Sequence, residues 1–266
     1  MSVRDKFALL RRASRVWAVA SIHGEAERLT RIHGEIERRF QPGDRLVYLG
    51  NAMGHGAEVR GAIDELLSFR RRMLARPGMF LFDIAFLRGA QEEMWQKLLQ
   101  LQFAPNPREV FGWMVEHGMG ATLSAYGGSI QQGFVAARAG PLALTRWTSQ
   151  LRSDMQAVPG HYSLLSALRR AAYTDDGALL FVHAGVDPER PLSAQSDSLW
   201  WATTSFMKLE RSYGGFIRVV RGFDPRHAGI ETAQFTASID GGAGFGGVLI
   251  AACFDRRGEI IEAIEA

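Results

Sequence analysis

The 266-residue sequence has a single cysteine, so no disulfide can form within the chain. Cys253 lies in the apolar run 248–254, where we expect a small buried side chain in a strand. No run approaches the roughly 18 apolar residues of a membrane span. Residues 1–15 mix charged and apolar types and lack the uninterrupted apolar segment of a secretory signal. We therefore expect a cytoplasmic protein with no membrane partner.

An excess of charge of one sign is also missing, since 31 lysines and arginines face 28 acidic residues, for a net charge of +3. Arginine clusters at 11–12, 38–39 and 70–72 fall on helix-like segments, which favours solvated helix faces. A nucleic-acid surface needs basic residues that converge on one patch with aromatic stacking partners. No such patch can be read, so nucleic acid is not an expected partner.

The apolar content of 47% is enough to bury a large core without disulfides or metals. Three strand, loop and helix units follow one another in the first hundred residues. The expected strands are 15–20, 45–49 and 79–87, and the expected helices are 25–40, 59–74 and 93–101. Repeated units of this kind predict an α/β fold with a largely buried sheet.

The strand signal then disappears, and four prolines punctuate short helical segments between residues 104 and 176. This pattern predicts an inserted helical cap. Strands are expected again at 178–182, 215–220, 235–239, 248–254 and 259–264. No linker or low-complexity segment divides the sequence, so residues 1–266 are predicted to form one domain.

Glycine-containing loops follow five of the expected strands. They are Ala20–Gly24, Gly50–Gly56, Gly89–Glu92, Phe181–Gly185 and Val220–Phe223. Taken in order, these loops resemble the signature loops of the calcineurin-like metallophosphoesterases, in the bacterial branch related to serine/threonine protein phosphatases and diadenosine tetraphosphatases. The resemblance covers essentially the whole chain. It implies a metallophosphoesterase-type β-sandwich flanked by helices, with the segment 104–176 as the cap.

The resemblance also implies two divalent metals, which a carboxylate bridges and which supply a hydroxide to attack phosphorus. The sequence departs from the family at most positions that would serve this chemistry. The replacements are Ser21 and Asn51 for aspartates, Ala90 for an asparagine, Gln91 for the acid histidine, His55 for a phosphate-binding arginine and Phe223 for a histidine. Only His23 and His183 remain as imidazole ligands, and Asn51 offers a neutral oxygen.

Electrostatics argues against a dinuclear site. Two dications about 3.5 Å apart repel by roughly 19 kcal/mol even at an effective dielectric constant of 20, and no carboxylate offsets this repulsion here. A single zinc or nickel ion could still be held by His23, His183, Asn51 and a water. The alternative, which we favour, is that both histidines are hydrogen-bonded packing residues at strand ends.

Arg88 and Arg221 lie beside these loops and are candidate clamps for a phosphate or carboxylate, with a structural role as the alternative. Gln91 and His55 either hold an anion through neutral hydrogen bonds or have drifted after catalysis was lost. The glycine-rich stretch 241–247 resembles a phosphate-binding loop. No helical pattern follows it, so tight turns beneath the site are the better interpretation.

The function predicted from these observations is that of a degenerate, serine/threonine phosphatase-like metallophosphoesterase. Such a pseudophosphatase would bind or regulate a protein or a phosphorylated ligand and would need no cofactor. One alternative is an active phosphoester hydrolase with an altered single-metal site. Another is a structural partner of an active phosphatase or kinase.

Overall fold

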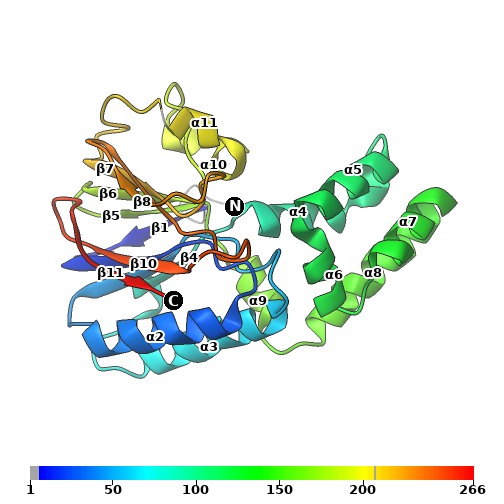
Figure 1. Cartoon of the computed structure of the whole chain (residues 1–266), viewed down its shortest axis with the longest axis horizontal. Coiled ribbons are helices and arrows are strands. Elements are labelled where there is room, and N and C mark those ends of the chain that lie inside the picture. Colours follow the sequence, from blue (N-terminus) through cyan, green and yellow to red (C-terminus); the bar gives the residue numbers. More distant parts are fainter. Residues whose placement is uncertain (1–5, 207) are drawn as a thin grey trace.

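Two β-sheets face each other at the centre of the protein, with helices outside them and a helical arm to one side (Figure 1). The computed structural model describes residues 6–206 and 208–266. The five-stranded sheet has the order β11 (Ile260–Glu265), β10 (Ile250–Phe254), β2 (Arg15–Val19), β3 (Asp44–Tyr48) and β4 (Ile84–Phe86). The six-stranded sheet has the order β1 (Phe7–Leu10), β5 (Ala171–Thr174), β6 (Leu179–Val182), β7 (Arg218–Arg221), β9 (Thr236–Asp240) and β8 (Gly229–Thr232). The α/β prediction with flanking helices is confirmed.

Strand β2 shows how the core is divided. Successive side chains of a strand point to opposite faces of its sheet. Val16 and Ala18 accordingly pack between the sheets, while Trp17 and Val19 pack on the opposite face. That outer face is covered by α2 (Ala26–Arg39) and α3 (Val59–Leu74), whose buried residues recur at helical spacing.

The outer face of the six-stranded sheet is covered by α10 (Ser198–Trp201) and α11 (Thr203–Phe206), neither of which was predicted. Leu199, Trp200 and Phe206 pack there against residues of β6 and β7. The remaining helix of the body, α4 (Ala90–Leu98), follows β4 and begins earlier than expected.

The helical arm contains α5 (Pro107–Met114), a π-helical turn (Val115–Met119), α6 (Gly120–Ala125), α7 (Ile130–Ala139) and α8 (Pro141–Gln156), and α9 (His161–Ser166) returns the chain to the body (Figure 1). These helices lie within the predicted cap. The predicted segment, 104–176, was too long at its C-terminal end, because Ala171–Thr174 forms β5 of the six-stranded sheet.

Three strands were missed by the sequence analysis. These are β1, β5 and β8. Strand β1 pairs with β5, which lies more than 150 positions later in the sequence, and Phe7 is opposite Ala171. Because each strand depends on this distant partner, no local sequence pattern predicts either one. Arg11 and Arg12, expected on a helix-like segment, lie in the turn after β1.

The strand predicted at 79–87 is largely wrong, because the strand observed in this segment, β4, covers Ile84–Phe86 alone. Leu81–Asp83 forms a 3-10 turn instead. The Asp83 carboxylate accepts a hydrogen bond from the Phe80 backbone amide at 2.9 Å and pairs with Arg45 at 2.9 Å. These two contacts stabilise the turn although the apolar sequence favours a strand. Phe80, Leu81 and Phe82 are exposed as a result.

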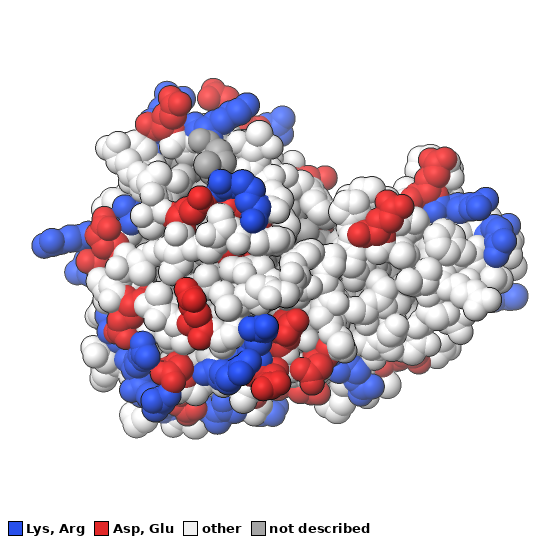
Figure 2. Space-filling model, viewed as in Figure 1, with Lys and Arg blue, Asp and Glu red and all other residues white. Residues whose placement is uncertain are grey.

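The surface charges agree with solvated helix faces. Acidic and basic side chains alternate over α2 and α3 on the face shown in Figure 2, and Glu35 on α2 pairs with both Arg38 and Arg39. In the part of the chain that the structure describes, no helix is both long and apolar enough to cross a bilayer. Cys253 is buried in β10, and burial raises the pKa of its thiol to about 12, as expected for a packing residue.

Candidate functional site

The five predicted loops meet at one end of the two sheets. Strands β2, β3 and β4 are parallel neighbours in one sheet, and β6 and β7 are parallel neighbours in the other. Within each sheet the carboxyl ends of these strands therefore lie side by side, as at the ligand sites of open α/β sheets. Backbone hydrogen bonds join the loops directly: Ser21 donates to Gly222 at 3.0 Å, and His23 donates to Asn51 at 2.7 Å.

Asn51 lies at the centre of this junction and is buried. Its side-chain oxygen accepts a hydrogen bond from the Gln91 backbone amide at 2.9 Å, which fixes the orientation of the Asn51 amide. The Asn51 Nδ2 atom then faces Nε2 of His23 at 3.2 Å. Since Nδ2 is a donor, His23 Nε2 must be the acceptor, and the ring proton resides on Nδ1.

Nδ1 of His23 has no hydrogen-bond partner among the described residues. Burial holds the pKa of His23 well below its usual value, and the neighbouring imidazoles of His55, His183 and His227 lower it further. His23 is therefore neutral near pH 7. Both His23 and Asn51 have left-handed backbone conformations, with φ of 52° each, which non-glycine residues adopt mostly where the surrounding structure enforces them.

His183 enters from the opposite sheet and is fully buried. Its Nδ1 atom donates a hydrogen bond to the Leu49 carbonyl oxygen at 2.8 Å, so the lone pair lies on Nε2. That Nε2 atom is buried and has no partner among the described residues. Burial lowers the pKa of His183 to about 4.

Two phenylalanine rings fill the space around these histidines. Phe223 stacks on His183 with ring centroids 5.4 Å apart and an interplanar angle of 14°. Phe245, from the loop after β9, packs against His23 at 5.2 Å, His55 at 4.2 Å and His227 at 4.4 Å between centroids. The centre of the site is therefore a cluster of imidazoles and apolar rings.

Gln91 and His55 connect the site to the helical arm. Gln91 Nε2 donates to the carbonyl oxygen of His117, in the π-helical turn, at 2.7 Å. His55 lies beneath Gly118 of the same turn, where an added Cβ would come within 2.5 Å of its Nε2 atom. Burial and the neighbouring His117 and His227 lower the pKa of His55. Both side chains thus contact the cap instead of an open cleft.

The remaining predicted positions are also enclosed. Ser21 is buried, and its hydroxyl has no partner among the described residues. Ala90 is buried at the first turn of α4.

Each candidate anion clamp has a carboxylate partner. Arg88 pairs with Glu93 at 3.0 Å. Arg221 is buried, pairs with Asp224 at 2.7 Å, and lies over the Phe206 ring at 4.4 Å. An anion at either arginine would have to share or displace that partner. These ion pairs are compatible with the structural role that is the alternative to anion binding.

The donor set does not fit the metals that the family resemblance implies. The described residues contain no group of three or more histidine, cysteine or carboxylate side chains placed to hold an ion. The Asn51 oxygen already accepts a hydrogen bond, and His23 Nε2 faces an amide donor. Among the described residues of the site, Ser21 Oγ, Gln91 Oε1 and His183 Nε2 are buried acceptors without a partner, and His183 provides the one imidazole nitrogen of these three.

Sequence reasoning missed Glu92, which is buried beneath the site. Its carboxylate accepts backbone hydrogen bonds from Asn51 at 2.9 Å, Met53 at 3.2 Å and Gly89 at 2.7 Å. Burial raises the pKa of Glu92, and these three donors oppose that shift. The sequence did contain a signal for Glu92: it lies three residues after Gly89, which is the spacing of a capping box at the start of a helix.

Phe245 and His227 were missed as well. Phe245 is the only aromatic residue of the stretch 241–247, which had been interpreted as turns beneath the site. His227 is held by Asp240, whose carboxylate lies 2.9 Å from its Nδ1 atom. The signal for Phe245 in the sequence was an aromatic residue within a glycine-rich loop that follows a strand.

No family profile and no curated protein matches the sequence. Among solved structures, the chain is similar to a protein assigned as a diadenosine tetraphosphatase, with a TM-score of 0.60 and 20% identity over 98% of each chain. It is also similar to a serine/threonine phosphatase from Saccharomyces cerevisiae, with a TM-score of 0.52 and 14% identity over 98% of this chain and 84% of that one. A variant of a cold-active protein tyrosine phosphatase gives a TM-score of 0.54 and 13% identity over 98% and 85%. These similarities show the metallophosphoesterase fold.

Proposed function

We propose that this chain, with its metallophosphoesterase fold, is a pseudophosphatase: a binding or regulatory protein that does not hydrolyse phosphoesters. The observation that carries the proposal is the packing of Phe223 on His183 and of Phe245 on His23. Apolar rings occupy the surroundings of the two imidazoles that a metal would need. Asn51, in addition, presents an amide donor to His23.

Catalysis of phosphoryl transfer depends on cations that neutralise the developing charge and on a group that protonates the leaving oxygen. Gln91, at the position of the family's acid, has no titratable proton and is engaged with the arm. His55, at the position of the phosphate-binding arginine, is neutral because its pKa is lowered. The residues at these positions therefore support neither step.

One observation favours a second candidate, a hydrolase with a single metal. His183 Nε2 is a buried imidazole nitrogen with a lone pair and no partner among the described residues. A zinc ion shared between His183 Nε2 and His23 Nε2 would have to displace the Asn51 amide from His23. The rearrangement makes this candidate less favourable than the first.

Metal analysis combined with an activity assay tests the proposal. We expect the purified protein to contain well under one equivalent of Mn, Fe, Zn or Ni and to hydrolyse para-nitrophenyl phosphate no faster than the His183→Ala variant. His161→Ala is the matched control, because His161 is a buried histidine that lies outside the site and bonds Tyr126. Stoichiometric metal that is lost with His183→Ala, but retained with His161→Ala, would favour the single-metal hydrolase.

Binding of anions tests what the site retains. Backbone amides and neutral imidazoles without metals are expected to hold inorganic phosphate only at about the millimolar level, worth roughly 4 kcal/mol. Isothermal titration calorimetry measures this directly. A micromolar dissociation constant would contradict the proposal that the site lacks a cation.

A further inference from the structure

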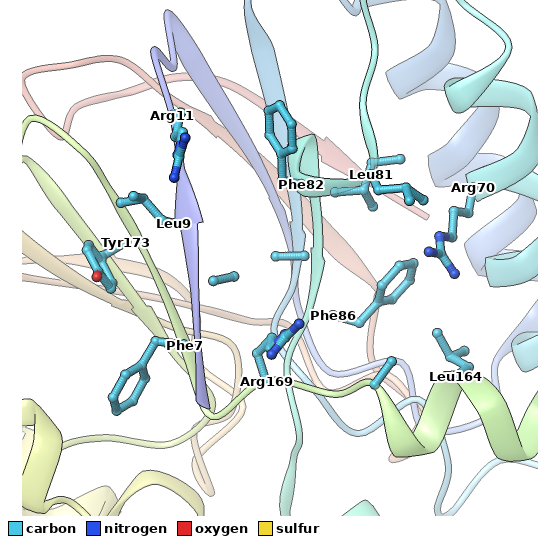
Figure 3. A pocket seen from close by; sticks show the side chains of 14 residues that line it. Phe7, Leu9, Arg11, Arg70, Leu81, Phe82, Phe86, Leu164, Arg169 and Tyr173 are labelled. Atoms are coloured by element: carbon cyan, nitrogen blue, oxygen red, sulfur yellow. The ribbon is translucent and has the colours of Figure 1, made fainter. Parts of the chain in front are cut away.

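A groove of about 880 Å³ lies along one side of the sandwich, and none of the site residues described above lines it. One wall is β1, the edge strand of the six-stranded sheet, and the other is the turn 81–83 with β4, the edge strand of the five-stranded sheet (Figure 3). Its volume falls within the range of about 300 to 1,000 Å³ that ligand sites occupy. Phe7, Leu9 and Phe86 are among the apolar residues that line it.

The turn beside the groove displays an apolar cluster that is rigid before any partner binds. Phe80, Leu81 and Phe82 are 57%, 63% and 52% exposed. The rings of Phe80 and Phe82 stack at 5.3 Å with an interplanar angle of 8°. Asp83 anchors the turn through the Phe80 amide and Arg45. A large exposed apolar cluster of this kind marks an interaction site, and its rigidity reduces the entropy lost on binding.

The strand that forms the other wall has a free edge. Strand β1 pairs only with β5 in the described sheet, so its outward backbone groups have no strand partner. Unpaired strand edges accept extended peptides through main-chain hydrogen bonds, and the flanking pockets then select alternate side chains. The groove therefore suits an extended segment better than a helix or a compact small molecule.

The charges of the lining residues indicate the sign of the partner. Arg11, Arg70 and Arg169 line the groove, and no acidic residue is among the described residues that do so. Figure 3 shows Arg11 at the end of β1 and Arg70, from α3, on the opposite side of the groove near Leu81. Arg70 lies 6.0 Å from the centre of the Phe86 ring, so a cation stands beside an apolar surface. Alternating acidic and large apolar side chains would match this pattern.

We propose that this groove binds an extended, acidic and apolar segment of a partner protein. The segment adds alongside β1, places apolar side chains against Phe82 and Phe86, and places carboxylates near Arg11 and Arg70. The inference does not depend on whether the site at the carboxyl ends of the strands is active. It goes beyond the proposed function because it locates the surface through which a partner is bound.

The test uses synthetic peptides of about ten residues in which valine and phenylalanine alternate with glutamate. A second set has lysine in place of glutamate, and a third has the same composition in scrambled order. We expect fluorescence anisotropy to give a dissociation constant of about 10 µM for the acidic set. Binding of the lysine set is expected to be at least tenfold weaker.

Two double variants examine the groove, and one examines a remote surface. Phe80→Ala with Phe82→Ala removes the apolar cluster, and Arg11→Glu with Arg70→Glu reverses the charge. Arg138→Glu with Leu142→Ala, at exposed positions of the arm, is the matched control. All these side chains are at least partly exposed, so the variants are expected to fold, which circular dichroism checks.

Binding should weaken at least tenfold in both groove variants and remain unchanged in the arm variant. Hydrogen exchange should slow at residues 7–10 when the acidic peptide is bound. Equal binding by the groove variants, equal binding of the lysine set, or no binding by any peptide would overturn the proposal. Self-association that Phe82→Ala abolishes would show instead that a second copy of the chain occupies the groove.

Discussion

Nδ2 of Asn51 lies 3.2 Å from Nε2 of His23, so an amide donor faces an imidazole nitrogen at the centre of the site. The contact determines the tautomer of His23, because the Asn51 oxygen is occupied by the Gln91 amide. The orientation of the Asn51 amide thus makes Asn51 and His23 part of one hydrogen-bond network.

Asn51→Asp should reverse this arrangement. A carboxylate oxygen would face the lone pair of His23 Nε2, so we expect the proton of His23 to move from Nδ1 to Nε2. The buried charge should reduce the free energy of unfolding by about 1 to 3 kcal/mol. Nitrogen-15 chemical shifts of the His23 ring report the tautomer, and urea unfolding reports the stability. An unchanged tautomer would contradict the hydrogen-bond assignment at Asn51.

Glu92→Gln should destabilise the protein more than an ordinary surface substitution. The amide loses one of the acceptor oxygens that now serve the backbone of Asn51, Met53 and Gly89, and it leaves at least one buried N–H group unpaired. We expect a loss of about 3 kcal/mol in urea unfolding. Glu116→Gln, at an exposed position, is the control and should change stability by less than about 0.5 kcal/mol. Similar effects of the two variants would show that Glu92 does not hold the loops together.

Gly54→Ala should strain the site. Gly54 has a φ of +128°, and a Cβ there would lie 2.6 Å from Nδ1 of His23. Gly78→Ala is the matched control, because Gly78 also has a positive φ, +79°, but nothing lies within 4 Å of its added Cβ. We expect Gly54→Ala to lower the free energy of unfolding by about 1 to 3 kcal/mol more than the control does. Equal losses would mean that His23 moves aside freely.

Acid should destabilise the protein through His183. Its pKa is about 4 in the folded protein and near 6.5 when unfolded, so the unfolded state binds the proton first as the pH falls. The stability contributed by this group is fully present above pH 6.5 and is lost between about pH 6.5 and pH 4, by about 3 kcal/mol. His183→Asn keeps a donor for the Leu49 carbonyl oxygen and does not titrate. Urea unfolding across this pH range should show a shallower loss for the variant, and identical profiles would contradict the assignment.

The sequence by itself determined the α/β fold and indicated the five glycine-containing loops, while the replacement of metal ligands remains what the family resemblance implies. It could do so because strand and helix periodicity and loop glycines are local properties. The positions Ser21, Asn51, Gln91, His183 and Phe223 were all identified from the chain order of the loops. Parallel strands bring the loops of each sheet together, and hydrogen bonds from Ser21 to Gly222 and from His183 to Leu49 join the two sets.

Only the tertiary structure decided which contacts these residues make. Strands β1 and β5 could not be predicted, because each is stabilised by a partner far away in sequence. The turn at Leu81–Asp83 replaces an expected strand because Arg45, on a neighbouring strand, pairs with Asp83. The partners of Arg221 and Glu92, the tautomer of His23 and the position of Phe245 depend on contacts between loops. Such contacts form through packing and hydrogen bonding in three dimensions, which local sequence patterns do not specify.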